Sequence, residues 1–259
     1  MNWNLITRLT ELIGEKMNLN KKIFENLDLE GIVKKSIKTH IKNVEKDLPA
    51  DSTIDESYVA EPKQFKQVSE FVSQKTKTAH IELYKEYVES LNSVSSKLDT
   101  ANRTDVNSRH CDYRSLKLDE TCNLNATWLH ELYFANCFDP HSEVVMDSIA
   151  YLKLQRDFGT FDDWQRDFMA CALSVGNGWA ILGYHMFLKK YVNFIVSNHN
   201  QDVPVGFYPL IVLDMWQHSY FKDYLTDKKS YLISQMRELN WATIEDRFKK
   251  AEAIAHVLK

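Results

Sequence analysis

The stretch FYPLIVLDMWQHSYFKDYL at residues 207–225 joins the most apolar run of the chain to a polar, aromatic segment. The run ends at Asp214, and His218 follows four residues later, one helical turn away. An Asp and a His at this spacing are commonly an exposed, hydrogen-bonded pair on a helix surface. Because Asp214 closes an apolar strand, we instead expect its carboxylate to be buried, and a buried carboxylate must be paired, hydrogen-bonded or metal-bound. The context therefore favours two ligands of one ion.

Upstream of Asp214, short β-branched or aromatic runs occupy residues 178–187, 189–198 and 207–216. Helical apolar spacing predicts helices at 3–17, 22–46, 64–98, 125–138, 143–157 and 160–175 and over the last 40 residues, whereas residues 99–124 are polar and irregular. Strands grouped in one run favour an antiparallel sheet in an α+β protein over a repeated βαβ unit.

Composition excludes several classes of protein. The chain has 259 residues, 44% of them hydrophobic and 26% charged, with a net charge of −4, so it is neither a disordered chain nor an overall basic nucleic-acid binder. No apolar run is long enough to span a membrane, and the first residues lack the pattern of a signal peptide. The four cysteines form no CxxC pair. We therefore expect reduced thiols in an intracellular protein, in the cytoplasm or mitochondrial matrix and not secreted.

The segment at residues 22–46 predicts an amphipathic helix with a basic row beside its apolar face. The apolar row is Val33, Ile37, Ile41 and Val44, and the basic row is Lys34, Lys38, Lys42 and Lys46. The basic row is typical of a solvated helix face; the alternative is contact with an acidic partner, RNA or lipid head groups. Residues 48–57 resemble a linker. We therefore interpret residues 1–58 as a helical extension outside the core.

Two further histidines lie in helical, aromatic surroundings. His130 is part of TWLHELYF, and His80 is part of TKTAHIELYKEYV. Taken singly, a histidine on an apolar helix face is more often a satisfied core residue than a ligand. Together with Asp214 and His218, however, they complete a set of three histidines and one aspartate, which suits iron, manganese or zinc.

Several segments together resemble the iron/manganese superoxide dismutase family over roughly residues 60–259. They are YKEYVESLN (84–92), WLHELYFANCF (128–138), LKLQRDFGTFDDWQRDF (152–168), GNGWAIL (176–182) and LDMWQHSYFKDY (213–224). The resemblance implies an α+β fold. A helical hairpin domain at residues 59–141 would precede an α/β domain at 142–259 with a three-stranded antiparallel sheet, and a metal would lie between the two.

The resemblance also assigns roles. It implies one iron or manganese ion, with iron preferred, held by His80, His130, Asp214 and His218. It implies Tyr87 as the catalytic residue of the substrate gateway. It also implies that Trp179 and Trp216 lie beside the ligands. The first ligand depends on the alignment, because a direct count from Tyr87 falls on Ala79 and one deleted residue moves it to His80.

The chain departs from the family where dimers form. Gln217 replaces a Glu that reaches the partner's ligand histidine, and Phe221 replaces a Tyr. The histidine that pairs with that Tyr falls near Leu83 or Tyr84, and neither is His. Because both members of one bridge are lost together, this surface is adjusted, and we expect a homodimer or a heterodimer with a dismutase-like chain. The alternative is a monomer.

The family's active-site glutamine, which hydrogen-bonds the metal's solvent ligand, is also missing. Its two known positions fall on Ala126 and near Val175, and Phe134 stands where a Trp is usual. This hydrogen bond tunes the metal's potential and the solvent's pKa, so we expect reduced activity.

Two functions remain open. The first is dismutation of superoxide to oxygen and hydrogen peroxide, which the apparently complete ligand set favours. The second is a structural role for the same fold in a large assembly such as a mitochondrial ribosome, a respiratory complex or a virion. The N-terminal extension, through which such an assembly would form, and the altered dimer contacts favour this second function.

Overall fold

The computed structural model describes residue 35 and residues 59–257. The chain divides into two compact units, and residues 59–257 belong to the second, Asp55–Lys259. Apart from Lys35, residues 1–58 lie outside the described residues, and so do the helices, the basic row and the linker predicted there.

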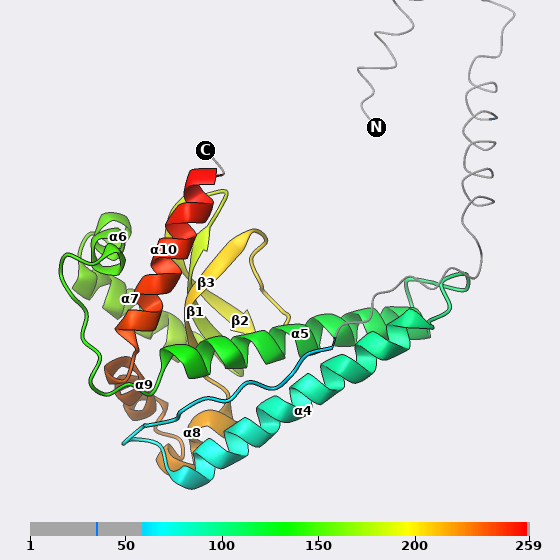
Figure 1. Cartoon of the computed structure of the whole chain (residues 1–259), viewed down its shortest axis with the longest axis horizontal. Helices are drawn as coiled ribbons and strands as arrows, with labels where there is room; N and C mark the ends of the chain where they lie inside the picture. Colours follow the sequence, from blue (N-terminus) through cyan, green and yellow to red (C-terminus); the bar gives the residue numbers. More distant parts are fainter. Residues whose placement is uncertain (1–34, 36–58, 258–259) are drawn as a thin grey trace, which may run out of the picture. The chain divides into compact units, whose positions relative to one another are not determined.

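Two long helices form a hairpin, α4 (Gln74–Asp99) and α5 (Asp112–Asn136) (Figure 1). Helix α4 begins where the Ser73 side chain accepts a hydrogen bond from the amide of Thr76, a common N-cap arrangement. Its buried side chains, among them His80, Tyr84 and Val88, recur one turn apart and so form one face. This face packs against α5 and brings His80 inside the hairpin.

The segment before α4 differs from the prediction, which extended the helix back to residue 64. Residues 59–69 are extended and run along the hairpin (Figure 1). Their backbone groups bond to side chains instead of to a helix: Asn92 accepts from the amide of Ala60 (2.7 Å) and donates to its carbonyl (2.9 Å). The amide of Lys63 donates to the Tyr84 hydroxyl (3.0 Å). Within the mispredicted stretch itself, the amide of Glu70 donates to Glu238 (2.9 Å) and the Tyr224 hydroxyl donates to the carbonyl of Phe71 (2.9 Å). Such contacts over long sequence separations override the local helical pattern.

Helix α5 also differs, because it begins at Asp112, well before the predicted start at residue 125. Its first half carries mostly exposed or half-buried polar side chains, and its buried residues are confined to the second half, from Ala126 to Asn136. A helix that lies largely in solvent shows no apolar stripe, so periodicity alone misses it.

The sheet has three antiparallel strands in the order β2-β1-β3, which confirms the predicted arrangement. The strands are β1 (Gly178–His185), β2 (Lys190–Ser197) and β3 (Phe207–Asp214). Gly178 has a φ of +152°, and a Cβ there would lie 2.1 Å from the Val196 carbonyl oxygen, so only glycine fits. The register pairs Trp179 with Asp214, which places the indole beside the carboxylate.

Five further helices complete the unit (Figure 1). They are α6 (Ile149–Phe158), α7 (Phe161–Ser174), α8 (Gln217–Tyr224), α9 (Lys228–Arg237) and α10 (Trp241–Val257). Helices α6 and α7 pack on the sheet, and α5 and α10 pack on β3. The predicted α+β class with a helical hairpin ahead of the sheet is therefore confirmed. Within residues 59–257, no helix is both long and apolar enough to cross a membrane.

Candidate metal centre

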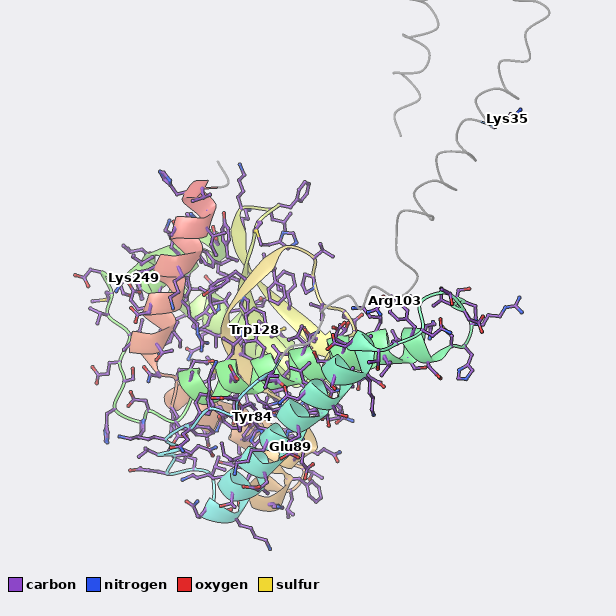
Figure 2. The ribbon with its side chains drawn as sticks, turned by 45° about the vertical axis from the view of Figure 1, so that its right-hand side comes forward. Lys35, Tyr84, Glu89, Arg103, Trp128 and Lys249 are labelled. Carbon is purple, nitrogen blue, oxygen red and sulfur yellow. The ribbon has the colours of Figure 1, made fainter. Side chains whose placement is uncertain are left out.

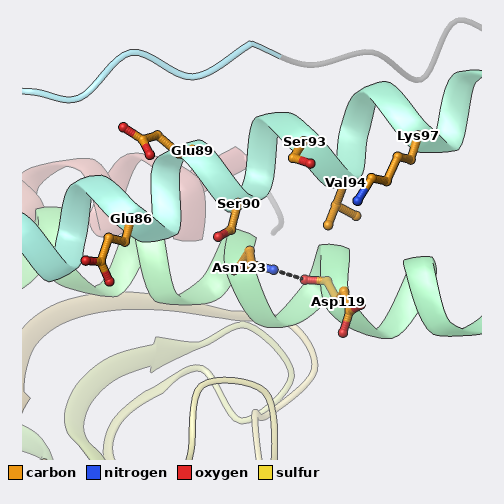
Figure 3. Close-up of a pocket in the computed structure, with 8 residues that line it drawn as sticks. All are labelled: Glu86, Glu89, Ser90, Ser93, Val94, Lys97, Asp119 and Asn123. Carbon is orange, nitrogen blue, oxygen red and sulfur yellow. Dashed lines mark hydrogen bonds between the residues drawn. The ribbon is translucent and has the colours of Figure 1, made fainter.

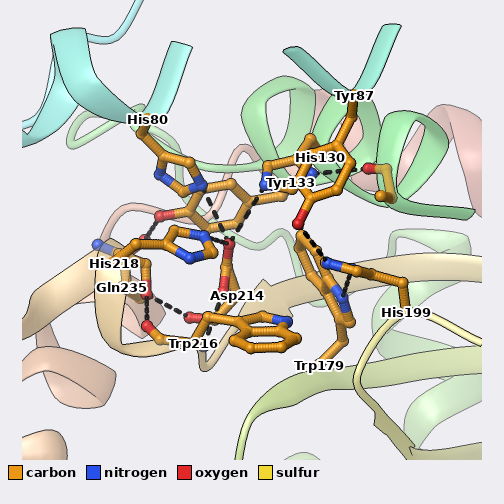
Figure 4. A network of polar contacts seen from close by, with 12 residues as sticks. His80, Tyr87, His130, Tyr133, Trp179, His199, Asp214, Trp216, His218 and Gln235 are labelled. Atoms are coloured by element: carbon orange, nitrogen blue, oxygen red, sulfur yellow. Dashed lines mark hydrogen bonds and ion pairs between the residues drawn. The ribbon is translucent and has the colours of Figure 1, made fainter. Parts of the chain in front are cut away.

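Histidine side chains from three helices converge on one carboxylate oxygen at the end of β3 (Figure 4). The Nε2 atoms of His80 and His218 lie 3.0 and 2.9 Å from Oδ2 of Asp214, and Nε2 of His130 lies 3.8 Å from it. The potential ligand atoms of these four residues all lie within 4.8 Å of one another. His80, His130 and Asp214 are buried, and His218 is partly exposed.

Local structure aims the carboxylate at the histidines. Asp214 is the last residue of β3, and its Oδ1 accepts a hydrogen bond from the amide of Trp216 (2.8 Å), which leaves Oδ2 for the histidines. Its main-chain carbonyl is 2.8 Å from the Tyr231 hydroxyl, which donates to it, and 3.0 Å from the hydroxyl of Ser219. Asp214 is thus held through both its side chain and its backbone before any ion is considered.

His130 has the tautomer that a metal ligand needs. Its Nδ1 lies 2.6 Å from the Ala126 carbonyl oxygen, which only accepts, so Nδ1 carries the proton. Nε2 therefore presents a lone pair to the cluster, and it is buried with no hydrogen-bond partner among the described residues. Burial lowers the pKa of His130 to about 3, with a further contribution from His80. The imidazole is therefore neutral at pH 7.

The charge of the cluster also suits a cation. Burial raises the pKa of Asp214, but His218 and the hydrogen bonds from His218 and His80 outweigh it and hold the pKa well below its ordinary value. Burial lowers the pKa of His80 more than Asp214 raises it. A buried, ionised carboxylate beside three imidazoles, of which His130 is neutral and lacks a partner at Nε2, fits an iron or manganese ion, which takes nitrogen and oxygen ligands together.

The predicted Tyr87 and Trp179 meet at a residue that the sequence analysis missed, His199 (Figure 4). The Trp179 indole, which only donates, lies 3.1 Å from Nδ1 of His199. Nδ1 is therefore the acceptor, and Nε2 carries the proton and donates to the Tyr87 hydroxyl (2.9 Å). Burial lowers the pKa of His199 to about 4, so this ring too is neutral at pH 7.

His199 lies within the same aromatic shell as the cluster. Its ring stacks on Trp216 with centroids 5.1 Å apart and lies 6.1 Å from the His130 ring. It comes from the polar turn SNHNQD after β2. A histidine directly after a strand was the available signal. His199 therefore adds a buried polar side chain beside the cluster.

The remaining predicted residues have different surroundings. Trp216 is half-buried and stacks on both His199 and His218. Phe134 is buried, with its ring centroid 4.9 Å from that of His80.

Gln217 is exposed and Phe221 is 47% exposed, so the side chains of the predicted dimer surface do lie at the surface of this chain. The dimer itself stays a prediction.

An acidic groove lies between α4 and α5 (Figure 3). It is lined by Glu86, Glu89, Ser90, Ser93, Val94, Lys97, Asp119 and Asn123. None of these residues belongs to the histidine cluster, but Glu86 precedes Tyr87 and helps raise its pKa, after the larger effects of burial, Cys122 and Asp214. The approach to Tyr87 therefore carries negative charge.

Comparison with known proteins gives the family. The sequence model of "Iron/manganese superoxide dismutases, C-terminal domain" matches residues 148–247. The chain is 33% identical over 179 residues to "Superoxide dismutase [Fe]" of Aquifex pyrophilus, covering 68% of this chain and 83% of that protein. It is 38% identical over 95 residues to "Superoxide dismutase [Mn]" of Nocardia asteroides, covering 36% of this chain and 46% of that protein. The chain belongs to the iron/manganese superoxide dismutase family.

Proposed function

We propose that this chain dismutates superoxide to oxygen and hydrogen peroxide at one iron or manganese ion held by His80, His130, Asp214 and His218. The observation that carries the proposal is the lone pair of His130 Nε2, which is buried, unpartnered and aimed at the same space as the other ligand atoms. Iron is preferred, since two relatives that are 33% identical over 83% of their own length are dismutases named for iron.

The ion, when bound, supplies one-electron chemistry between its +2 and +3 states. The protein's part is to hold that ion with neutral imidazoles and one carboxylate and to deliver protons, because peroxide formation consumes two protons. Asp214 stays ionised and His130 stays neutral through the burial and hydrogen bonds described above. Both oxidation states accept such a donor set.

Tyr87 and His199 hold a proton at the open side of the cluster. Since His199 Nε2 donates to the Tyr87 hydroxyl, the hydroxyl's own proton is free to point at a substrate oxygen. Burial raises the pKa of Tyr87, so the phenol keeps this proton at neutral pH. We therefore assign Tyr87 as the group that hydrogen-bonds the substrate, with His199 and Trp179 as the residues that position it.

The acidic groove supports a reduced rate. Superoxide is an anion, and Glu86, Glu89 and Asp119 place like charge beside its gateway. Electrostatic steering of a charged substrate raises association rates, so an opposing field lowers them.

The test is metal analysis of the purified full chain, together with stopped-flow decay of superoxide. We expect one iron or manganese ion per chain and a rate that scales with metal content. Asp214→Asn should lose both the metal and the activity, whereas Asp105→Asn, in the exposed loop between α4 and α5, should lose neither. A chain that loads fully with either metal and leaves superoxide decay at the buffer rate would exclude the enzyme.

That result would support the second candidate, a structural role for the fold in a large assembly. The observation in its favour is the changed surface at Gln217 and Phe221, which are exposed in this chain. In either case we propose that this surface is covered by a second copy or by a related dismutase-like chain. Sedimentation velocity tests whether this surface is covered. The interface is excluded if the chain is a monomer at micromolar concentration and also binds no dismutase-like chain through this surface.

A further inference from the structure

Two turns lie together at the end of the sheet where β1 ends and β3 begins (Figure 1). Residues 186–189 connect β1 to β2, and residues 205–206 form the turn before β3. The register pairs His185 with Phe207, and the amide of Met186 donates to the Gly206 carbonyl (2.9 Å), so the two turns are bonded to each other. Asp214 is at the other end of β3, seven residues from Phe207, which is about 23 Å at ~3.3 Å per residue.

The tips of these turns expose large apolar side chains. Phe187 is 87% exposed, Val205 is 92% exposed and Leu188 is 50% exposed. We call these three residues the turn patch. Scattered exposed apolar residues are ordinary, but a group at the tips of two bonded turns marks a surface that contacts something.

Three amides of the first turn are bonded within the protein. Besides the bond from Met186, the amide of Lys189 donates to the His185 carbonyl (2.8 Å), and the amide of Leu188 lies 3.3 Å from Nδ1 of the His185 ring. A turn whose amide groups are bonded internally can enter an apolar medium without leaving those donors unpaired. The His185 ring thus accepts a hydrogen bond that water would accept in an ordinary surface loop.

Cations lie directly beside the apolar tips. Lys189 and Lys190 are both exposed, and neither forms an ion pair with a described residue. A protein interface usually surrounds its apolar centre with a rim of directional hydrogen bonds. The turn patch instead has the ammonium groups of Lys189 and Lys190 beside it. Exposed apolar side chains next to two lysines suit a membrane surface, where acyl chains lie below anionic head groups.

We propose that the turn patch inserts into the surface of a membrane rich in anionic lipid, with Lys189 and Lys190 against the phosphate head groups. This surface does not depend on the metal centre, because it lies at the opposite end of β3. The apolar tips set the depth of insertion, and the lysines set the preference for negative charge.

The experiment is flotation of the full, metal-loaded chain with vesicles of phosphatidylcholine alone and with phosphatidylglycerol added. We expect binding that rises with phosphatidylglycerol and falls with salt. Phe187→Ser with Val205→Ser should weaken binding by about tenfold or more, because two apolar side chains no longer leave water. Lys189→Glu with Lys190→Glu should remove the dependence on phosphatidylglycerol. All variants retain residues 1–58, so any contribution from that segment is equal in each.

A matched control removes exposed apolar groups elsewhere. Val145→Ser with Met146→Ser changes side chains that are 59% and 73% exposed, between α5 and α6, and should bind as the wild type does. The proposal fails if the wild type does not float with anionic vesicles, or if the Phe187 and Val205 variant floats equally well. It also fails if that variant changes only the oligomeric state in vesicle-free solution, since the patch would then join copies of this chain.

Discussion

Replacing His199 by phenylalanine tests the hydrogen-bonded chain that connects Trp179 to Tyr87. The substitution keeps an aromatic ring to stack on Trp216 but removes both ring nitrogens, and so both hydrogen bonds (3.1 and 2.9 Å). The indole of Trp179, which is fully buried, then has no acceptor. An unsatisfied buried donor costs about 1–3 kcal/mol, so we expect the free energy of unfolding to fall by roughly 2 kcal/mol.

The effect on catalysis should exceed the effect on stability. Without His199, the Tyr87 hydroxyl loses the donor that orients it, and loss of such a supporting group typically lowers activity by about 10 to 100-fold. The assay is stopped-flow decay of superoxide, normalised to measured metal content, with urea unfolding of the same preparations.

His199→Gln is the matched variant, because its amide offers one acceptor and one donor, as the neutral ring does. Its activity should stay closer to the wild type than to the phenylalanine variant. If His199→Phe binds a full complement of metal and removes superoxide at the wild-type rate, the assignment of His199 as a positioning residue is wrong.

The remaining predictions concern the ligands, the gateway and the support beneath Asp214. Burial lowers the pKa of His130 from 6.5 to about 3, so between these values the unfolded chain binds a proton that the folded chain does not. As the pH falls from 6.5 to 5, the free energy of unfolding of the metal-free protein should therefore decrease by about 2 kcal/mol through this group. Urea unfolding of His130→Gln should show a weaker dependence of that free energy on pH. Glu86→Gln should raise the rate of superoxide decay at low ionic strength, with the difference vanishing in high salt, whereas Glu82→Gln, an exposed glutamate one turn earlier on α4, should change it less. Tyr231→Phe removes the hydroxyl that donates to the Asp214 carbonyl and should lower the unfolding free energy by about 1–2 kcal/mol; an unchanged urea midpoint would contradict this.

Local pattern predicts the parts of the molecule whose cause is local. The three strands alternate with turns in one run, and each lies within two residues of its predicted bounds. The pattern fails where side chains distant in sequence decide the conformation. Glu238 and Tyr224 bond to the backbone of residues 70 and 71, which lie outside any helix although the pattern predicts one there. The first half of α5 shows no stripe, because little of it is buried.

The sequence by itself determined the α+β class and the pairing of Asp214 with His218, since only the short turn from the end of β3 into α8 separates the two residues. Only the tertiary structure decided which other groups join them. His80 reaches Asp214 across 134 residues, and His199 reaches Tyr87 across 112. No spacing rule covers such distances. The α4–α5 hairpin packs against the end of β3 and so brings these distant residues together. The turn after β2, which is polar in sequence, places the buried imidazole of His199 beside them.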